Sequence, residues 1–264
     1  MDFEHDLNPA QRQAVTTTEG PVLVIAGAGS GKTRTIVYRL AHLVSGGVEP
    51  AAILLLTFTR KAAQEMLTRA GLLLAMGPDG VSGVSGGTFH AFAFATLRRF
   101  QAAAGFPDGF TVLDQADSED VLGQVRDRLG IGKGDRSFPR RSAVLGLLSK
   151  ARNKEMDVAD VLSREAFHLL PYAEDLTRIG EAYAAFRSEH HLLDYDDLLF
   201  SLERTLREHP DLADFLRQRH RYIMVDEYQD TNRVQARLTR LLAPASGNVM
   251  AVGDDAQSIY AFRG

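Results

Sequence analysis

The chain has 264 residues, of which 45% are hydrophobic and 24% charged, the proportions of an ordinary globular protein with one or two domains. Its apolar runs are far too short to span a bilayer, and its acidic start, residues 1–6, is unlike a signal peptide. Because the chain has no cysteine, disulfides and thiolate metal sites are excluded, and we expect a cytoplasmic protein without a membrane partner. The net charge of −4 argues against a wholly basic surface for nucleic acid but allows a local groove.

A glycine-rich segment follows the first apolar run, residues 21–25, and opens a predicted helix over Thr33–Val44. Such a turn lets backbone N–H groups converge at the positive end of the helix dipole, which suits a phosphate chain. Lys32 would reach the β- and γ-phosphates, and the Thr33 hydroxyl would ligate Mg²⁺. Ala26 stands where the phosphate-loop pattern has glycine, although two additional glycines keep the turn permissive. A plain loop is the alternative; we expect a nucleoside triphosphate site made of Ala26, Gly27, Ala28, Gly29, Ser30, Gly31, Lys32 and Thr33.

Both ends of the chain alternate continuous Val/Ile/Leu runs with helical segments, a pattern typical of parallel strands buried on both faces. In the first 90 residues it predicts strands Val22–Ala26 and Ile53–Phe58, the helix Arg60–Leu74 and a flexible loop Gly77–Gly87. After residue 191 it predicts helices Tyr195–Glu208 and Asn232–Leu242 and strands Tyr222–Val225 and Asn248–Val252.

Between these segments the strand signal nearly vanishes, and apolar residues recur at three- and four-residue spacing. This predicts amphipathic helices His90–Ala104, Ser118–Leu129, Ser142–Asn153, Asp157–Leu170 and Asp175–His191. We therefore expect the α/β class: a discontinuous nucleotide-binding domain with a parallel sheet, residues 1–90 and 191–264, carrying an all-helical inserted domain, residues 91–190. A basic concentration in the insertion fits a solvated helix face as well as a nucleic-acid surface: Arg136, Arg140, Arg141, Lys150, Arg152 and Lys154.

Adjacent carboxylates, Asp226 and Glu227, end the apolar strand Tyr222–Val225. Ligands of open α/β sheets bind at the carboxyl ends of strands, so these side chains are well placed for chemistry. Hydrolysis of a γ-phosphate needs a hard oxygen ligand for Mg²⁺ and a base that orients water. We expect Asp226 in the first role and Glu227 in the second, on a strand tip neighbouring that of the phosphate loop. An ordinary acidic turn is the alternative.

A third polar segment, Val252–Gly264, again follows a predicted strand. The neutral amide of Gln257 could sense a γ-phosphate. Tyr260, Phe262 and Arg263 bring two aromatic rings and a cation together, and bases of single-stranded nucleic acid stack on such side chains. Aromatic residues at this spacing also occur in ordinary cores.

Taken in order, the segments of the chain resemble the early motifs of UvrD/Rep/PcrA-like superfamily-1 DNA helicases. The matching segments are Leu7–Gln11, Ala26–Thr33, Thr57–Met66, Gly87–His90, Asp194–Leu199, Val225–Asn232 and Val252–Gly264. The resemblance implies a RecA-like P-loop NTPase domain with the family's helical accessory domain inserted in it. It also implies ATP and Mg²⁺ as cofactors, with Gln11 reading the adenine edge, Arg34 lying against the adenine, and Gln257 coupling the γ-phosphate to DNA.

The resemblance further implies contacts with DNA. Phe58 and Phe262 would wedge or stack bases, with Tyr260 beside them, and the sugar–phosphate backbone would meet Thr59, Thr88 and His90. Asp194, Asp196 and Asp197 resemble a motif lining the DNA path, although a helix cap and turn explains them equally well. Two positions depart from the family: Arg60 stands where Asn is common, and Phe262 where Trp is frequent.

These features predict the N-terminal ATP-binding half of a 3′–5′ DNA helicase that acts on single-stranded DNA and duplex junctions, with repair or replication proteins as partners. Since the chain stops after the third motif, we expect a recombinant fragment or a natural truncation that lacks the second RecA-like domain and is poorly active alone. One alternative is the helicase portion of a recombination helicase–nuclease. Another is a catalytically silent module that binds DNA or a helicase partner.

Overall fold

The computed structural model describes residues 3–75 and 77–254 of the chain. These residues form two compact units. Thr96–Leu202 together with Asn232–Val234 make up one, here called the helical unit, and the other described residues make up the α/β unit. The domain limits expected near residues 90 and 190 stay a prediction. No helix in the described part of the chain is both long and apolar enough to cross a lipid bilayer.

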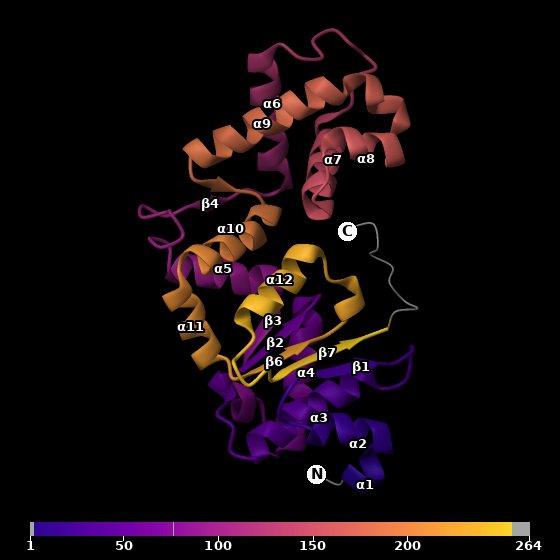
Figure 1. Cartoon of the computed structure of the whole chain (residues 1–264), viewed down its shortest axis with the longest axis vertical. Helices are drawn as coiled ribbons and strands as arrows, with labels where there is room; N and C mark the ends of the chain where they lie inside the picture. The colour runs from indigo at the N-terminus through magenta and orange to yellow at the C-terminus, as the bar shows by residue number, and fades with distance from the viewer. Residues whose placement is uncertain (1–2, 76, 255–264) are drawn as a thin grey trace. The chain divides into compact units, whose positions relative to one another are not determined.

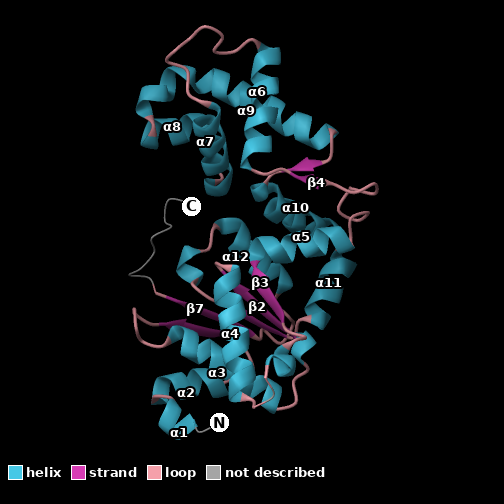
Figure 2. Cartoon of the chain, turned by 180° about the vertical axis from the view of Figure 1, so that it is seen from behind, coloured by secondary structure: helices cyan, strands magenta, loops and turns pink. Residues whose placement is uncertain are grey.

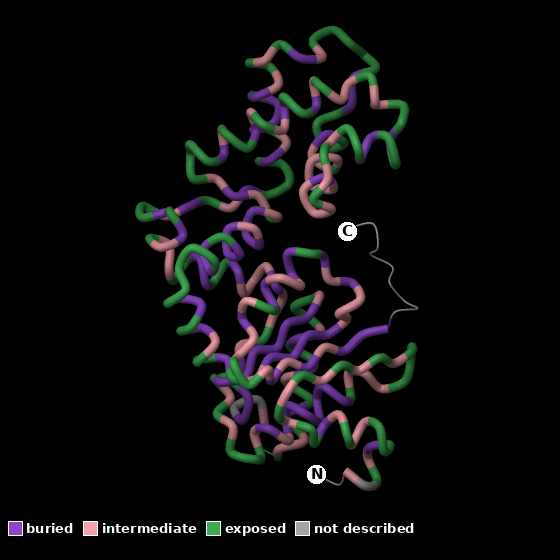
Figure 3. The backbone as a smooth tube through the Cα atoms, viewed as in Figure 1, coloured by how far each residue is buried: buried purple, intermediate pink, exposed green. Residues whose placement is uncertain are grey.

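The α/β unit is built on a five-stranded parallel sheet with the strand order β1-β7-β6-β2-β3 (Figure 1). Its strands are β1 (Val22–Ile25), β2 (Ile53–Thr57), β3 (Ser85–Thr88), β6 (Tyr222–Val225) and β7 (Val249–Gly253). Strand β2 is buried along its whole length, and its neighbour β6 is buried from Ile223 to Val225 (Figure 3). The α/β class and the parallel sheet predicted from the sequence are confirmed. Because all strands are parallel, their carboxyl ends share one edge of the sheet, here called the carboxyl edge.

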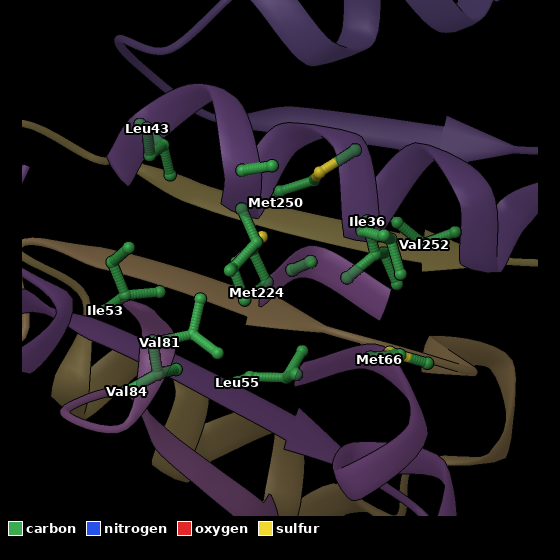
Figure 4. Packing of buried hydrophobic residues seen from close by; sticks show 14 residues of the cluster. Ile36, Leu43, Ile53, Leu55, Met66, Val81, Val84, Met224, Met250 and Val252 are labelled. Carbon is green, nitrogen blue, oxygen red and sulfur yellow. The ribbon is translucent and has the colours of Figure 1, made fainter. Parts of the chain in front are cut away.

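Helices cover both faces of this sheet, since α12 lies in front of it in Figure 1 and α4 lies in front of it in the reverse view of Figure 2. The α/β unit contains the whole of α1 (Phe3–Asp6), α2 (Pro9–Thr16), α3 (Lys32–Ser45), α4 (Arg60–Leu73) and α11 (Pro210–Arg219). Three helices are divided between the two units: α5 (Phe89–Arg99), α10 (Tyr195–Glu208) and α12 (Arg233–Leu242). Ile36 of α3 and Met66 of α4 pack with Leu55 of β2 and Met224 of β6 in one buried cluster (Figure 4). Each such side chain contributes roughly 1.5–3 kcal/mol by leaving water.

One strand of this five-stranded sheet was not predicted. The loop expected over Gly77–Gly87 contains β3, which pairs in parallel with β2. The strand signal is missing because Ser85, Gly86 and Gly87 carry almost no apolar surface. Gly86 packs closely against α4, since a Cβ at this position would lie 2.8 Å from Cδ1 of Leu67 and the Leu67 side chain would have to shift. A sequence pattern based on hydrophobicity therefore misses this edge strand.

The helical unit contains α6 (Gln115–Leu129), α7 (Arg141–Lys154), α8 (Val158–Glu165) and α9 (Ala173–Glu189). Helix α6 begins before Ser118 because Asp114 caps it, accepting a hydrogen bond from the Asp117 N–H in a capping box. The helix predicted over Asp157–Leu170 ends earlier, at Glu165, and a 3₁₀ segment, Phe167–Tyr172, follows it. This unit also holds a two-stranded parallel sheet of β4 (Thr111–Val112) and β5 (Leu192–Leu193), which the sequence did not predict.

Candidate nucleotide-binding site

Every strand of the sheet ends at a segment for which the sequence predicts a function. Along the carboxyl edge these are the glycine-rich loop after β1, Asp254 after β7, Asp226 and Glu227 after β6, Phe58 after β2, and Thr88 at the end of β3. The expectation that the phosphate loop and the carboxylate pair lie on neighbouring strand tips is wrong, because β7 pairs with both β1 and β6 and lies between them. The intervening strand brings Asp254 into the same site.

The glycine-rich loop is shaped for close approach of a ligand to its backbone. Gly29 and Gly31 have φ angles of 72° and 88°, a conformation that other residues adopt only with strain. The loop is anchored where the Ala26 N–H donates to the Gly253 carbonyl over 3.0 Å. Within it the Ser30 hydroxyl donates to the Gly27 carbonyl over 2.6 Å, while Gly27, Ala28, Gly29 and Ser30 are exposed. Helix α3 then begins at Lys32 and points its N-terminus at this loop.

The Lys32 ammonium lies at the centre of the site and is nearly buried. Its Nζ donates to the Ala26 carbonyl over 3.0 Å and lies 3.5 Å from Oδ2 of Asp254. The two side chains of this ion pair are only 10% and 4% exposed. A cation held at the mouth of a glycine-rich loop is positioned to meet phosphate oxygens. Thr33 is the next residue of α3 and is half-buried.

Asp226 carries the strongest electrostatic signal of the site. It is 5% exposed, and its Oδ1 is buried without a hydrogen-bond partner among the described residues. Burial, followed by the charge of Glu227, raises the pKa of Asp226 to about 6, although Lys32 acts in the opposite direction. A buried carboxylate oxygen with no partner costs stability unless a cation or donor satisfies it.

This oxygen and the Thr33 hydroxyl fit what Mg²⁺ requires. Mg²⁺ prefers hard oxygen ligands and is often bound by one or two carboxylates together with the phosphates of its substrate. The described residues hold no cluster of three or more His, Asp or Glu side chains that could bind a metal without such help.

Glu227 follows directly and has an unusual backbone, with φ 49° and ψ 46°. Its Oε2 accepts a hydrogen bond from Nε2 of Gln229 over 2.8 Å. Oε1 of Gln229 in turn accepts one from the Asp254 N–H over 2.9 Å. Gln229 and Asp254 lie inside longer sequence motifs that predict no role for either residue. Their partners depend on β7 lying beside β6, which residue spacing alone does not reveal.

Gln11 and Arg34, expected near an adenine, lie at the outer end of the loop. Gln11 donates from Nε2 to the Ser30 carbonyl over 2.8 Å and forms a capping box with Asn8 at the start of α2. Arg34 is 52% exposed, with its guanidinium 5.6 Å from the centre of the Tyr38 ring and 3.8 Å from Asp6. Gln11 therefore contacts the loop and Arg34 extends from α3, and neither side chain is buried.

Of the residues predicted to contact DNA, some lie at the ends of β2 and β3 and the others lie outside the described residues. Phe58 is half-buried at the end of β2, and His90 is half-buried in the first turn of α5. The Thr59 hydroxyl accepts from the Ala62 N–H and the Thr88 hydroxyl from the Ala91 N–H, each over 3.1 Å, so both cap the helices that follow. Three further predicted site residues lie outside the described residues: Gln257, Tyr260 and Phe262.

The acidic motif at residues 194–197 belongs to an ion-pair network inside the helical unit. Asp194 and Asp197 form a reciprocal capping box at the start of α10. Both carboxylates also pair with the guanidinium of Arg187, a side chain that is 7% exposed, and Asp197 pairs with Arg152 as well. The capping alternative is therefore realised, and it is reinforced by buried charge.

The basic concentration in the same unit is largely neutralised. Lys150 and Lys154 both donate to the Glu165 carboxylate, over 2.6 and 2.7 Å. Arg141 lies 3.6 Å from Asp120. Of the six basic residues, only two form no ion pair within the described part of the chain. They are Arg136 and Arg140, both exposed in the turn before α7.

Known proteins resemble this chain along nearly its whole length. The sequence profile of the UvrD/REP helicase N-terminal domain family matches residues 7–264. The chain is 38% identical over 259 residues to a protein of Leuconostoc citreum named ATP-dependent DNA helicase PcrA, and 38% identical over 263 residues to the protein of that name from Bacillus subtilis (strain 168). A Staphylococcus aureus (strain Mu50) protein of the same name is 36% identical over 259 residues. These matches cover 98% of this chain but 34% of each relative, so the chain spans about a third of the length of the curated relatives it matches.

Proposed function

Because the chain belongs to the UvrD/REP helicase N-terminal domain family, we propose that it forms the ATP-binding and single-strand-contacting part of an ATP-dependent DNA helicase. Its parallel sheet with a glycine-rich loop after β1 is the RecA-like P-loop fold of that family. One observation supports the proposal most strongly. The tips of β1, β7 and β6 place a lysine, an ion-paired aspartate and an orphaned aspartate oxygen in one site. This arrangement suits a cation bound together with a polyphosphate.

In this proposal ATP and Mg²⁺ are held by residues of the α/β unit. The backbone of Ala26–Gly31 would cradle the phosphates and Lys32 would neutralise them, while Thr33 and Asp226 would hold Mg²⁺. When bound, Mg²⁺ supplies charge neutralisation on the phosphate oxygens. Gln11 and Arg34 would meet the adenine at the outer end of the loop. The raised pKa of Asp226 fits this role, because a cation compensates a carboxylate that burial otherwise penalises.

Glu227 would act as the base for hydrolysis. It would accept a proton from the attacking water while the water oxygen bonds to the γ-phosphorus and the bond from that phosphorus to the β–γ bridging oxygen breaks. The products are ADP and inorganic phosphate. Glu227 lies beside Asp226 on the tip of β6, so the residue holding the metal and the base would share one turn.

Single-stranded DNA would cross the other half of the carboxyl edge, where β2 and β3 end. Phe58 would stack a base, and Thr59, Thr88 and His90 would meet the sugar–phosphate backbone. We extend the proposal to Tyr260, Phe262 and Gln257 from the family resemblance. Movement from 3′ to 5′, action at duplex junctions, repair or replication partners and a cytoplasmic location are proposed on the same basis.

The test is hydrolysis of ATP by the chain under single-turnover conditions, with and without single-stranded DNA. The wild-type chain should bind MgATP and hydrolyse it slowly, and single-stranded DNA should raise the rate. Lys32→Ala should remove hydrolysis, whereas the exposed Lys133→Ala of the helical unit should change nothing. Hydrolysis that survives Lys32→Ala unchanged would contradict the proposal. A wild-type chain that binds single-stranded DNA but does not hydrolyse MgATP would favour a catalytically silent binding module.

A further inference from the structure

The side chain of Gln229 connects two strand tips of the site. Its Nε2 donates to Oε2 of Glu227 over 2.8 Å, and its Oε1 accepts from the Asp254 N–H over 2.9 Å. The same Nε2 also lies 3.3 Å from Oδ2 of Asp230. Since Asp254 pairs with Lys32, a continuous chain of polar contacts runs from the phosphate-loop lysine through β7 to the Glu227 carboxylate.

The chemistry of its partners fixes the orientation of this amide. A carboxylate only accepts hydrogen bonds and a backbone N–H only donates, so the amide nitrogen must face Glu227 and the amide oxygen must face Asp254. Within the described residues, the bond from Gln229 is the only hydrogen bond of the Glu227 carboxylate. That carboxylate also stands beside Asp226, whose negative charge repels it. Without the Gln229 donor, no described hydrogen bond would fix the position of the Glu227 carboxylate.

The end of β7 is shaped around this amide. A Cβ on Gly253 would lie 2.7 Å from Oε1 of Gln229 and 3.2 Å from its backbone nitrogen. Gly253 does not have a positive φ, so its backbone would accept another residue. The restriction on this position therefore comes from Gln229 and not from the local conformation.

We propose that Gln229 is a positioning residue for ATP hydrolysis, which holds the Glu227 carboxylate in a fixed position relative to the end of β7. This inference rests on the proposed function, in which Glu227 is the base. A base must lie within hydrogen-bond reach of the water proton, and a displacement of about 1 Å costs up to 10²-fold in rate. Gln229 does not touch the phosphates itself, so its loss acts on the chemical step and leaves nucleotide binding intact.

The first experiment measures the MgATP dissociation constant and the single-turnover hydrolysis rate of Gln229→Met and Gln229→Glu. Methionine keeps the length of the side chain but removes both hydrogen bonds, and glutamate keeps the acceptor for Asp254 while removing the donor for Glu227. Both variants should hydrolyse ATP roughly 10–100-fold more slowly with a dissociation constant within about twofold of wild type. Gln124→Met, at an exposed position of α6, is the matched control and should behave as wild type.

The second experiment approaches the amide from β7. Gly253→Ala should slow hydrolysis by displacing the Gln229 side chain. Its effect should be much smaller in a Gln229→Ala background, where the 2.7 Å contact with Oε1 is removed and only the 3.2 Å contact with the backbone nitrogen of residue 229 remains. A structural role would instead weaken MgATP binding and lower the melting temperature together with the rate.

Each outcome has a separate meaning. Wild-type hydrolysis by Gln229→Met, or equal losses in binding and rate, would overturn the positioning role while leaving the proposed function intact. Fully additive effects of Gly253→Ala and Gln229→Ala would also overturn it. If the wild-type chain neither binds nor hydrolyses MgATP, the proposed function fails and this inference fails with it.

Discussion

Buried carboxylates are paired more completely in the helical unit than at the carboxyl edge of the sheet. In the helical unit, Arg187 is buried against Asp194 and Asp197, and two lysines share Glu165. At the carboxyl edge, Asp226 is equally buried but keeps an oxygen without a partner. Paired charge holds the helical unit together, whereas incompletely paired charge marks the place where a ligand supplies the missing contacts. The same residue types therefore have different roles in the two units.

The largest effect is expected at the base. Glu227→Gln keeps the shape of the side chain but removes its ability to accept a proton, so hydrolysis should fall about 10²–10⁴-fold while MgATP binding is retained. Parallel measurements of single-turnover hydrolysis and MgATP affinity test this. Undiminished turnover would exclude Glu227 as the base and show that other residues of the carboxyl edge carry out the hydrolysis.

A charge in the helical unit should instead affect folding. Arg187→Met leaves two buried carboxylates without their cation, and we expect the unfolding free energy to fall by about 3–5 kcal/mol. Chemical denaturation measures this loss, with the exposed Arg136→Met as its control. If Arg187→Met were as stable as wild type but defective in DNA binding, the acidic motif would line the DNA path after all.

Phe58 tests whether the carboxyl edge is divided between two ligands. Phe58→Ala should weaken single-strand affinity by about 1–3 kcal/mol while leaving MgATP affinity close to wild type. Titrations with a labelled oligonucleotide and with a labelled nucleotide measure the two affinities, and Phe167→Ala, an exposed phenylalanine of the helical unit, is the control. Equal losses in both would show that Phe58 acts through core packing.

His220 provides an unpaired buried group away from the carboxyl edge, just before the start of β6. Both ring nitrogens lack a hydrogen-bond partner in the described structure, and burial lowers the pKa of His220 from 6.5 to about 4. The unfolded chain therefore binds the proton more readily, so stability is lost as the pH falls from 6.5 towards 4, by about 2 kcal/mol at pH 5.

The raised pKa of Asp226 has the opposite sign, because its folded form binds the proton more readily and gains stability as the pH falls below about 6. The contribution of His220 is therefore read from the difference between wild type and His220→Leu, measured by denaturation at pH 7.5 and pH 5. Between pH 7.5 and pH 5 the unfolding free energy of His220→Leu should fall by less than that of wild type. An identical pH dependence in both proteins would show that the imidazole is solvated.

Hydrophobic pattern predicted most of the sheet and its helices. It placed β6 at the correct residues and β2 within one residue, since both are continuous apolar runs. It missed β3, whose small residues give no such signal. The glycine-rich loop and the carboxylate pair were visible as local motifs, but the strand order was not. For this reason the separation of the two by β7, and with it the contacts of Asp254 and Gln229, could only come from the structure.

The most direct measurement compares thermal unfolding of wild type and Asp226→Asn, each in EDTA and in saturating MgATP. In EDTA the variant should melt at a higher temperature, since it removes a buried carboxylate whose ionisation costs roughly 1–3 kcal/mol near pH 7. MgATP should raise the melting temperature of wild type and do so much less for the variant. A variant that melts lower than wild type in EDTA and gains the same stabilisation from MgATP would contradict a metal–nucleotide site at the tips of β1, β7 and β6.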